Sequence, residues 1–235
     1  MNAAVITAKG TTESMPEKNM TAIGGKPIVS YPIRAAVGAK SIDSTYVYTD
    51  GERIGKVALD LGAKWLHRPR HMAVADNSHE DAIIHAAELI CEDTDDEADI
   101  LVILLGNTVH ISSADIDRCV LRLKEDENLT GVLTAWKAQD DHPLRAMTTN
   151  CNGHLVPYPD ILRVSPNTNR QNYPPVYYYD QGVWAVRMPW VAAGLGPDPW
   201  TWMGPRCGLE VRPWVTGRDI HDEFDIEVSE WWVNR

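Results

Sequence analysis

The chain lacks any apolar run of the length that a membrane span needs. None of its 235 residues falls in a stretch approaching the ~20 consecutive apolar residues of a transmembrane helix. Lys9 and Glu13 interrupt the first fifteen residues, where a signal peptide would need an apolar core. We therefore expect a cytoplasmic protein with no membrane partner.

Cysteine and positive charge are also scarce. The four cysteines are spread out, with no CxxC pair and no His at ligand spacing, which argues against a zinc site and a disulfide framework. We expect these thiols to be reduced and mostly buried. Lys and Arg number 22 against 33 Asp and Glu, for a net charge of -11. Nucleic acid is bound through clustered cations, so we expect no nucleic-acid partner, although a few placed cations can still bind a small anion.

The apolar pattern predicts one α/β domain over residues 1–235, without internal repeats. Strands are expected at 3–8, 46–49, 64–66, 99–105 and 131–136, and helices at 28–37, 53–61, 78–91 and 112–124. The run at 99–105 is unbroken, as in strands buried on both faces of a parallel sheet. Such alternation predicts a doubly wound, mostly parallel sheet. Ligands of this class bind at the carboxyl ends of the strands, here the loops after Ala8, Thr49 and Leu105.

Residues 137–187 differ in composition, being rich in Pro, Tyr, Trp and Asn. Strand signals occur at 176–179 and 183–186. We interpret the region as a small antiparallel excursion that serves as a dimerisation arm or a substrate lid. Its aromatic residues suit an interface, although core packing explains them equally well.

The loop at residues 9–19 follows the first predicted strand directly. It holds a glycine, three hydroxyl side chains and two lysines, which suit backbone and cation contacts to a triphosphate. It is neither a Walker loop nor a GxGxxG motif. Taken alone, it is equally compatible with an ordinary polar turn.

Together with later segments, this loop resembles the cytidylyltransferases that activate sialic acid, related nonulosonic acids and Kdo. Their first loop has the form R-x-G-S-K-x-x-P-x-K-N, followed by G-K-P-L. The residues that match here are Gly10, Pro16, Lys18, Asn19 and Gly25, Lys26, Pro27, Ile28. The matches are specific because several occur in order.

The resemblance extends over nearly the whole chain. Residues 48–50 match S-T-D after the second strand, and 68–76 match R-P-x-x-L-A-x-D. Further on, 174–182 resemble P-x-x-Y-x-x-N-G, and 219–225 resemble D-I-D-T-x-x-D.

The resemblance implies an enzyme, a cytidylyltransferase that transfers CMP from CTP to the anomeric hydroxyl of a sialic-acid-like nonulosonic acid and releases pyrophosphate. It implies nucleotide binding by Ala8, Lys9, Gly10, Lys18, Asn19, Arg68 and Asn107. The implied catalytic residues are Lys9, Lys18 and Asp219, and the implied metal ligands are Asp219 and His221. Sugar binding is expected at Arg170, Tyr179 and Gln181. Mg²⁺, or alternatively Mn²⁺, is the implied cofactor, and a homodimer is the implied assembly.

Four departures from the family pattern leave alternatives open. Lys9 replaces an Arg, which keeps the charge but loses the bidentate fork. Glu13 replaces a Lys near the phosphates. Asn107 stands in a loop that is Q-P-T-S-P in the family, and His221 replaces an Asp, which favours Mn²⁺ or Zn²⁺ over Mg²⁺. A nucleotidyltransferase for another nucleotide or sugar, or a nucleotide-binding homologue without catalysis, are the alternatives. Asp219, Asp222 and Asp225 also suit a helix cap.

Overall fold

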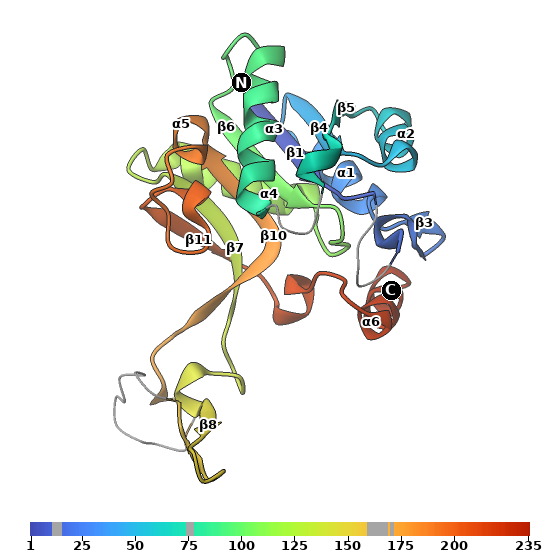
Figure 1. Ribbon diagram of the computed structural model, residues 1–235. Helices are drawn as coiled ribbons and strands as arrows, with labels where there is room; N and C mark the ends of the chain where they lie inside the picture. The colour runs from blue at the N-terminus through green and yellow to red at the C-terminus, as the bar shows by residue number, and fades with distance from the viewer. Residues whose placement is uncertain (11–15, 74–77, 159–168, 170–171) are drawn as a thin grey trace.

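The computed structural model describes residues 1–10, 16–73, 78–158, 169 and 172–235. Its centre is a seven-stranded sheet in the order β11-β7-β10-β6-β1-β4-β5 (Figure 1). β10 alone runs antiparallel to its two neighbours, while the remaining pairs are parallel. The strands are β1 Asn2–Thr7, β4 Ser44–Thr49, β5 Lys64–His67, β6 Ile100–Leu105, β7 Gly131–Lys137, β10 Tyr177–Arg187 and β11 Cys207–Val211. The predicted mostly parallel α/β sheet is thus confirmed.

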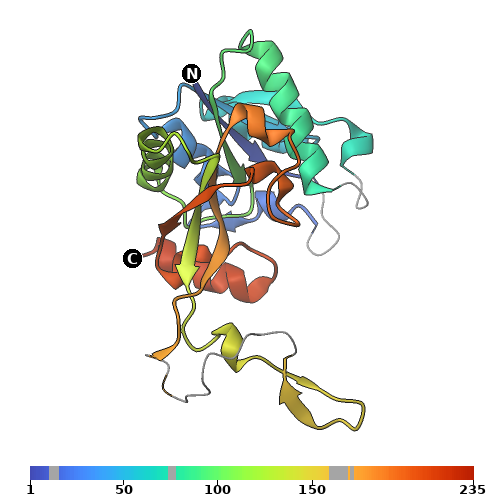
Figure 2. The same ribbon diagram turned by 90° about the vertical axis from the view of Figure 1, so that its left-hand side faces the viewer.

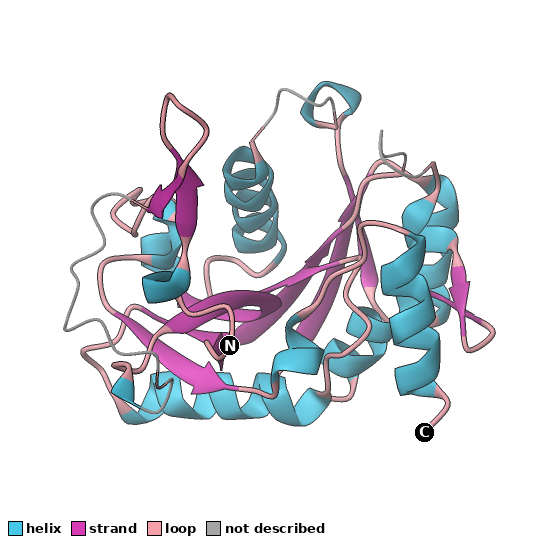
Figure 3. Ribbon diagram, turned by 90° about the horizontal axis from the view of Figure 1, so that it is seen from below, coloured by secondary structure: helices cyan, strands magenta, loops and turns pink. Residues whose placement is uncertain are grey.

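Helices cover both faces of this sheet (Figure 3). They are α1 Ser30–Val37, α2 Glu52–Asp60, α3 His79–Asp93, α4 Ser113–Glu125, α5 Met188–Val191 and α6 Glu223–Val233. Alternate residues of β1 point to opposite faces: Ala4 and Ile6 pack in the core with α1, α2 and α4, while Ala3 and Val5 pack with α3 and α5. Burial on both faces explains why the predicted strands are unbroken apolar runs.

The helix starts follow from their capping residues. Ser78 precedes α3, and its hydroxyl accepts a hydrogen bond from the Asp81 amide at 3.0 Å. Ser112 and Asp115 form a capping box at α4. Both caps satisfy amides that the first helical turn leaves free, and both confirm helix starts expected from the sequence.

A long arm leaves the sheet between β7 and β10 (Figures 1 and 2). It carries a small antiparallel hairpin, β8 Met147–Thr149 and β9 Leu155–Pro157. The two strand segments predicted at 176–179 and 183–186 are halves of the single strand β10, whose register with β7 shifts between Tyr179 and Trp184. Both halves of β10 pair with β7, and the second half also pairs with β6, so the arm consists of the described residues between Lys137 and Tyr177.

The C-terminal helix α6 packs beside a two-stranded ribbon, β2 Ala22–Ile23 and β3 Lys26–Pro27. Ile23, Ile28, Val109 and Ile220 form the small core beneath it. Among the described helices, none is long and apolar enough to cross a membrane.

The cysteines are all unpaired, as expected, but the expectation of burial was wrong. Cys119 alone is buried, because it faces the core from α4, whereas Cys151 lies exposed on the arm.

Candidate functional site

A cavity of about 240 Å³ opens at the carboxyl ends of β1 and β6. It lies where ligands of doubly wound sheets bind. Its lining residues are Thr7, Ala8, Lys9, Lys18, Asn19, Arg68, Ser78, His79, Leu105 and Asn107. The structure therefore brings the predicted nucleotide-binding residues together, with Gly10 adjoining them. Three of the lining side chains are cationic, so the cavity suits an anion.

Gly10 lies where the first loop meets the loop after β4. Its amide donates to Asp50 Oδ1 at 2.9 Å. A Cβ atom on Gly10 would lie 2.9 Å from the Gly51 Cα, closer than real side chains approach. The glycine is therefore needed for the contact between these two loops, which positions the residues that follow β1.

Lys18 is a buried cation on the short 3₁₀ turn Lys18–Met20. Its ammonium donates to the backbone carbonyl of Ile220 at 2.8 Å. Burial lowers the pKa of Lys18, while the nearby carboxylates of Asp219 and Asp225 oppose that shift. The side chain thus joins the first loop to the segment that carries Asp219.

Asn19 presents an unsatisfied acceptor inside the site. Its Nδ2 donates to the Lys9 carbonyl at 2.9 Å, and its residue is 4% exposed. Its Oδ1 is buried with no hydrogen-bond partner among the described residues. Buried polar atoms are nearly always paired, so Asn19 Oδ1 indicates a place for a ligand donor such as a hydroxyl or amino group.

Arg68 is buried beside the cavity and held from two sides. Its Nε donates to the Met72 carbonyl at 2.9 Å, and its guanidinium lies over the Tyr48 ring, 5.5 Å from the centroid. Burial lowers the pKa of Arg68, although a guanidinium stays charged in proteins. The cation is fixed in orientation before any ligand arrives.

Four lining residues were not foreseen from the sequence: Thr7, Ser78, His79 and Leu105. His79 Nε2 lies 3.1 Å from Thr7 Oγ1, and its ring packs against Trp184 and Trp202. Burial, then the charges of Arg68 and Lys9, lower the pKa of His79 to about 4. The imidazole is neutral at pH 7. The cap signal of Ser78, just after the 68–76 motif, was the available clue.

The acidic side of the site is built around Asp219. Its Oδ2 accepts from Asn107 Nδ2 at 3.0 Å, and its Oδ1 lies 3.0 Å from His221 Nε2. A carboxylate and an imidazole side by side fit a divalent cation whose other ligands are phosphate oxygens or water. No group of three or more His, Cys, Asp or Glu within the described ranges is placed to hold a metal by itself.

Asp222 and Asp225 act as the helix cap that the sequence also allowed. They form a capping box at the start of α6. Asp225 additionally accepts from the His221 amide at 2.9 Å and from Arg218 at 2.6 Å. These carboxylates therefore fix the backbone beside His221.

Of the residues predicted to bind the sugar, the two that the structure describes, Tyr179 and Gln181, do not line the cavity. Arg170, like Glu13, lies outside the described residues. Tyr179 packs edge-on against Trp200 at 4.6 Å between ring centroids, and Gln181 lies at the irregularity of β10. Their roles remain predictions.

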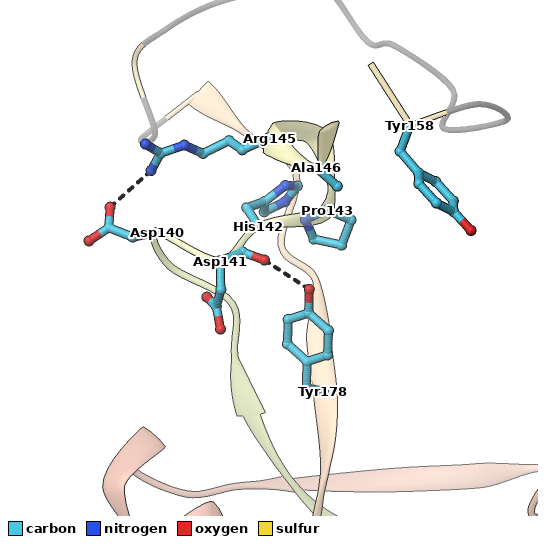
Figure 4. Close-up of a pocket in the computed structure, with 8 residues that line it drawn as sticks. All are labelled: Asp140, Asp141, His142, Pro143, Arg145, Ala146, Tyr158 and Tyr178. Carbon is cyan, nitrogen blue, oxygen red and sulfur yellow. Dashed lines mark hydrogen bonds and ion pairs between the residues drawn. The ribbon is translucent and has the colours of Figure 1, made fainter. Parts of the chain in front are cut away.

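A second cavity, of about 490 Å³, lies on the arm (Figure 4). It is lined by Asp140, Asp141, His142, Pro143, Arg145, Ala146, Tyr158 and Tyr178. Tyr178 donates to the Asp141 carbonyl at 2.8 Å, and Arg145 pairs with Asp140 at 3.1 Å. The arm thus has its own polar and aromatic surface, separate from the lining of the sheet-edge cavity.

A doubly wound sheet with a cation-lined cavity at its strand ends defines an α/β protein of the nucleotide-binding class. The chain belongs to the cytidylyltransferase family, whose family model matches residues 3–153. The matched region includes every predicted nucleotide-binding residue, but not Asp219 or His221.

Curated relatives are similar over shorter segments. The chain is 37% identical over 87 residues to an N-acylneuraminate cytidylyltransferase of Oncorhynchus mykiss, covering 37% of this chain and 20% of the relative. It is 38% identical over 63 residues to a pseudaminic acid cytidylyltransferase of Campylobacter jejuni, covering 27% of each chain. The matched segments thus span only about a fifth to a quarter of these relatives.

Solved structures are similar over the whole fold. A CMP:2-keto-3-deoxy-manno-octonic acid synthetase complexed with CTP has a TM-score of 0.72 at 16% identity, covering 100% of this chain and 99% of that one. A 4-diphosphocytidyl-2C-methyl-D-erythritol synthase from Anaerococcus prevotii has a TM-score of 0.68 at 14% identity, covering 99% and 96%. These likenesses establish the fold.

Proposed function

We propose that the protein transfers CMP from CTP to the anomeric hydroxyl of a sialic-acid-like nonulosonic acid and releases pyrophosphate. The observation that carries the proposal is the cavity in which Lys9, Lys18 and Arg68 lie with the unsatisfied acceptor of Asn19. A nucleoside triphosphate supplies both the negative charge and the hydroxyl or amino donors that these groups require. The names of the curated relatives support CTP and a nonulosonic acid as the substrates.

The cations would act by neutralising charge and positioning the reactants. Attack of an anomeric oxygen on the α-phosphate forms a new oxygen–phosphorus bond and breaks the bond to the pyrophosphate oxygen. Such a reaction needs alignment and fixed positive charge more than covalent help. Lys9 and Lys18 would neutralise phosphate oxygens, while Asn19 and Arg68 would hold the nucleoside side.

Asp219 and His221 would hold a divalent cation, Mg²⁺ or Mn²⁺, at the acidic side of the site. The adjacent oxygen and nitrogen ligands fit such an ion, and the imidazole favours Mn²⁺. When bound, the ion would supply further charge neutralisation at the phosphates. Asn107 and Lys18 hold the carboxylate and backbone of this segment in place.

Two alternatives rest on particular features. Transfer to another acceptor is consistent with the fold, which the erythritol synthase shares. Loss of catalysis is consistent with Glu13 and His221, which replace a Lys and an Asp of the family pattern. It is also consistent with Asp219, because each of its two carboxylate oxygens already has a side-chain partner. Turnover of CTP by the unmodified protein excludes the second alternative. Activity that emerges only in a Glu13→Lys, His221→Asp double variant would favour it.

Isothermal titration calorimetry with CTP, UTP, ATP and GTP, each with Mg²⁺ and with Mn²⁺, tests the proposal without a choice of sugar. We expect selective binding of CTP, followed by pyrophosphate release in a screen of nonulosonic acids. Asn19→Leu should weaken CTP binding, whereas the exposed Lys26→Met should not. Binding of no nucleotide, or of another base in preference, would contradict the proposal.

The arm is proposed as the contact between two copies in a homodimer. Its exposed apolar side chains include Leu155 at 68% and Tyr158 at 56%. Exposed apolar groups gathered on a projecting element are typical of interaction surfaces. Oligomeric state in solution is the direct test.

A further inference from the structure

Arg212 is a buried cation that the cavity does not use. It follows β11, and its side chain is 2% exposed. Its Nε donates to Asp180 Oδ2 at 2.9 Å, and its Nη2 lies 2.8 Å from the same oxygen. Asp180 is fully buried. A charge pair withdrawn this far from water needs further hydrogen bonds to be tolerated, and the structure shows where they go.

The remaining donors of Arg212 reach two backbone carbonyls from distant segments. Nη1 donates to the His110 carbonyl at 2.9 Å, and Nη2 donates to the Thr216 carbonyl at 3.0 Å. His110 stands three residues after Asn107, and Thr216 three residues before Asp219. One rigid, planar guanidinium therefore holds both chain segments that bring Asn107 and Asp219 to each other.

Asp180 connects the same network to the base of the arm. It lies at the irregularity of β10, where its Oδ1 accepts from the Gly182 amide at 2.9 Å and from the Thr134 hydroxyl. Gly217, in the loop that leads to Asp219, packs so closely that a Cβ there would lie 3.0 Å from the Asp180 Cβ. The network thus joins the sheet, the arm base and the loops of the acidic side.

We propose that Arg212 is a positioning residue that sets the placement of Asn107 and Asp219 by binding the His110 and Thr216 carbonyls. Its catalytic consequence rests on the proposed function, but its structural consequence does not. Arg212 does not line the cavity, so its loss should leave nucleotide contacts by Lys9 and Arg68 intact while displacing the acidic side.

Hydrogen exchange followed by mass spectrometry tests the placement directly. Arg212→Met alone leaves the buried Asp180 carboxylate without the cation that it pairs with, so the variant is combined with Asp180→Asn, which keeps an oxygen acceptor for the Gly182 amide. Arg212→Lys is the second variant, since it retains the charge but not the fork. We expect amides in 106–112 and 213–222 to exchange about tenfold faster in both variants, with α3 unchanged.

Arg187→Met is the matched control. Arg187 also donates to backbone carbonyls, Leu129 at 2.9 Å and Leu123 at 2.6 Å, but at the opposite end of β10. It should leave exchange in 106–112 and 213–222 unchanged. Uniform acceleration across the sheet, or unchanged exchange in these two segments, would overturn the proposal. If the Arg212→Lys variant exchanged its amide hydrogens at the wild-type rate, the proposal would also be overturned, because Arg212 would then serve only as the charge partner of Asp180.

Kinetics provide the second measurement. For an active wild-type enzyme, we expect Arg212→Lys to lower kcat about 100-fold through misplacement of the acidic side, with the KM for CTP changed less than about twofold, as for lost transition-state interactions. If the loss of kcat/KM were as large but came from a raised KM for CTP alone, the proposal would be overturned. A wild-type protein that neither binds nor uses CTP would contradict the proposed function instead, and hydrogen exchange alone would then decide the role of Arg212.

Discussion

Lys18 is a single residue that contacts both the cavity and the segment carrying Asp219. Its ammonium is buried and bonded to the Ile220 carbonyl, and the residue lines the cavity. Burial lowers its pKa, and Asp219 and Asp225 limit that effect. Its charge therefore faces both the acidic segment and the space in which we place the phosphates.

Lys18→Met should abolish most activity without unfolding the protein. Removal of one fixed cation from a reacting phosphate typically costs about 100- to 1,000-fold in kcat, and the methionine stem fills similar space. Steady-state pyrophosphate release and thermal unfolding are the measurements, with the exposed Lys26→Met as control. A variant with more than about a tenth of wild-type kcat would contradict the catalytic role.

His79 gives the protein a predictable pH dependence. Its pKa is about 4 in the folded state, against 6.5 for the free side chain. The unfolded state therefore binds more protons between these values, so stability falls as the pH drops from about 6.5 towards 4. When the pH is lowered from 7.5 to 5, the free energy of unfolding of the wild type should fall by up to about 2 kcal/mol more than that of His79→Gln.

Urea denaturation of both proteins at the two pH values measures this difference. His154→Gln, on the exposed end of the arm hairpin, serves as control and should follow wild type. Equal losses in wild type and His79→Gln would show that the imidazole titrates alike in both states.

At the scale of elements, the packing of β10 against Arg212 and Thr134 requires a glycine at position 182. The Gly182 amide donates to Asp180, and a Cβ there would collide with Arg212 Nη2, Thr134 Oγ1 and Asp180 Oδ1. None of these atoms can retreat without breaking a buried hydrogen bond. The glycine that matched the family pattern in the sequence is thus explained by the packing of the network.

Gly182→Ala should lower the free energy of unfolding by about 1–3 kcal/mol, the usual cost of overpacking a filled site. Because the displaced atoms hold the acidic side, exchange in 213–222 should rise together with the loss of stability. Urea unfolding and hydrogen exchange measure the two effects. A stable variant with unaltered exchange would mean that the network is not close-packed.

The sequence predicted elements better than it predicted their connections. The strands of the sheet were recognisable because their apolar runs are buried on both faces. The helices were recognisable by their capping residues, as at Ser78 and Ser112. β10 was interpreted as two strands because Asp180, Gln181 and Gly182 interrupt its apolar pattern, and the burial of Asp180 becomes evident only with Arg212 in place.

The site was predictable where motifs are continuous. Lys18 and Asn19 follow from one loop, whereas His79 reaches the cavity through the start of α3 and pairs with Thr7, 72 positions earlier. Contacts of that kind depend on tertiary packing, which spacing does not encode.

On the scale of the whole molecule, the arm is the part most extended from the body (Figures 1 and 2). If the arm joins two copies of the chain, replacing its exposed apolar residues with charged ones should separate the two copies. The Leu155→Glu, Tyr158→Glu double variant should shift the mass measured by light scattering from a dimer to the 26.2 kDa monomer, because buried charges oppose association.

Leu59→Glu is the matched control for this experiment. Leu59 is 56% exposed, as is Tyr158, but lies on α2. It should leave the mass unchanged. A monomeric wild type, or a dimer that survives the double variant, would exclude the arm contact.

The hydrogen bond from Lys18 to Ile220 joins residues 202 positions apart. Contacts of such sequence separation require closure of a very long loop, and proteins rich in them fold slowly. During synthesis, the first loop leaves the ribosome long before its acidic counterpart exists. Lys18 therefore lacks its Ile220 partner while the chain is being made, and the site is completed only when the segment that carries Asp219 and Ile220 docks.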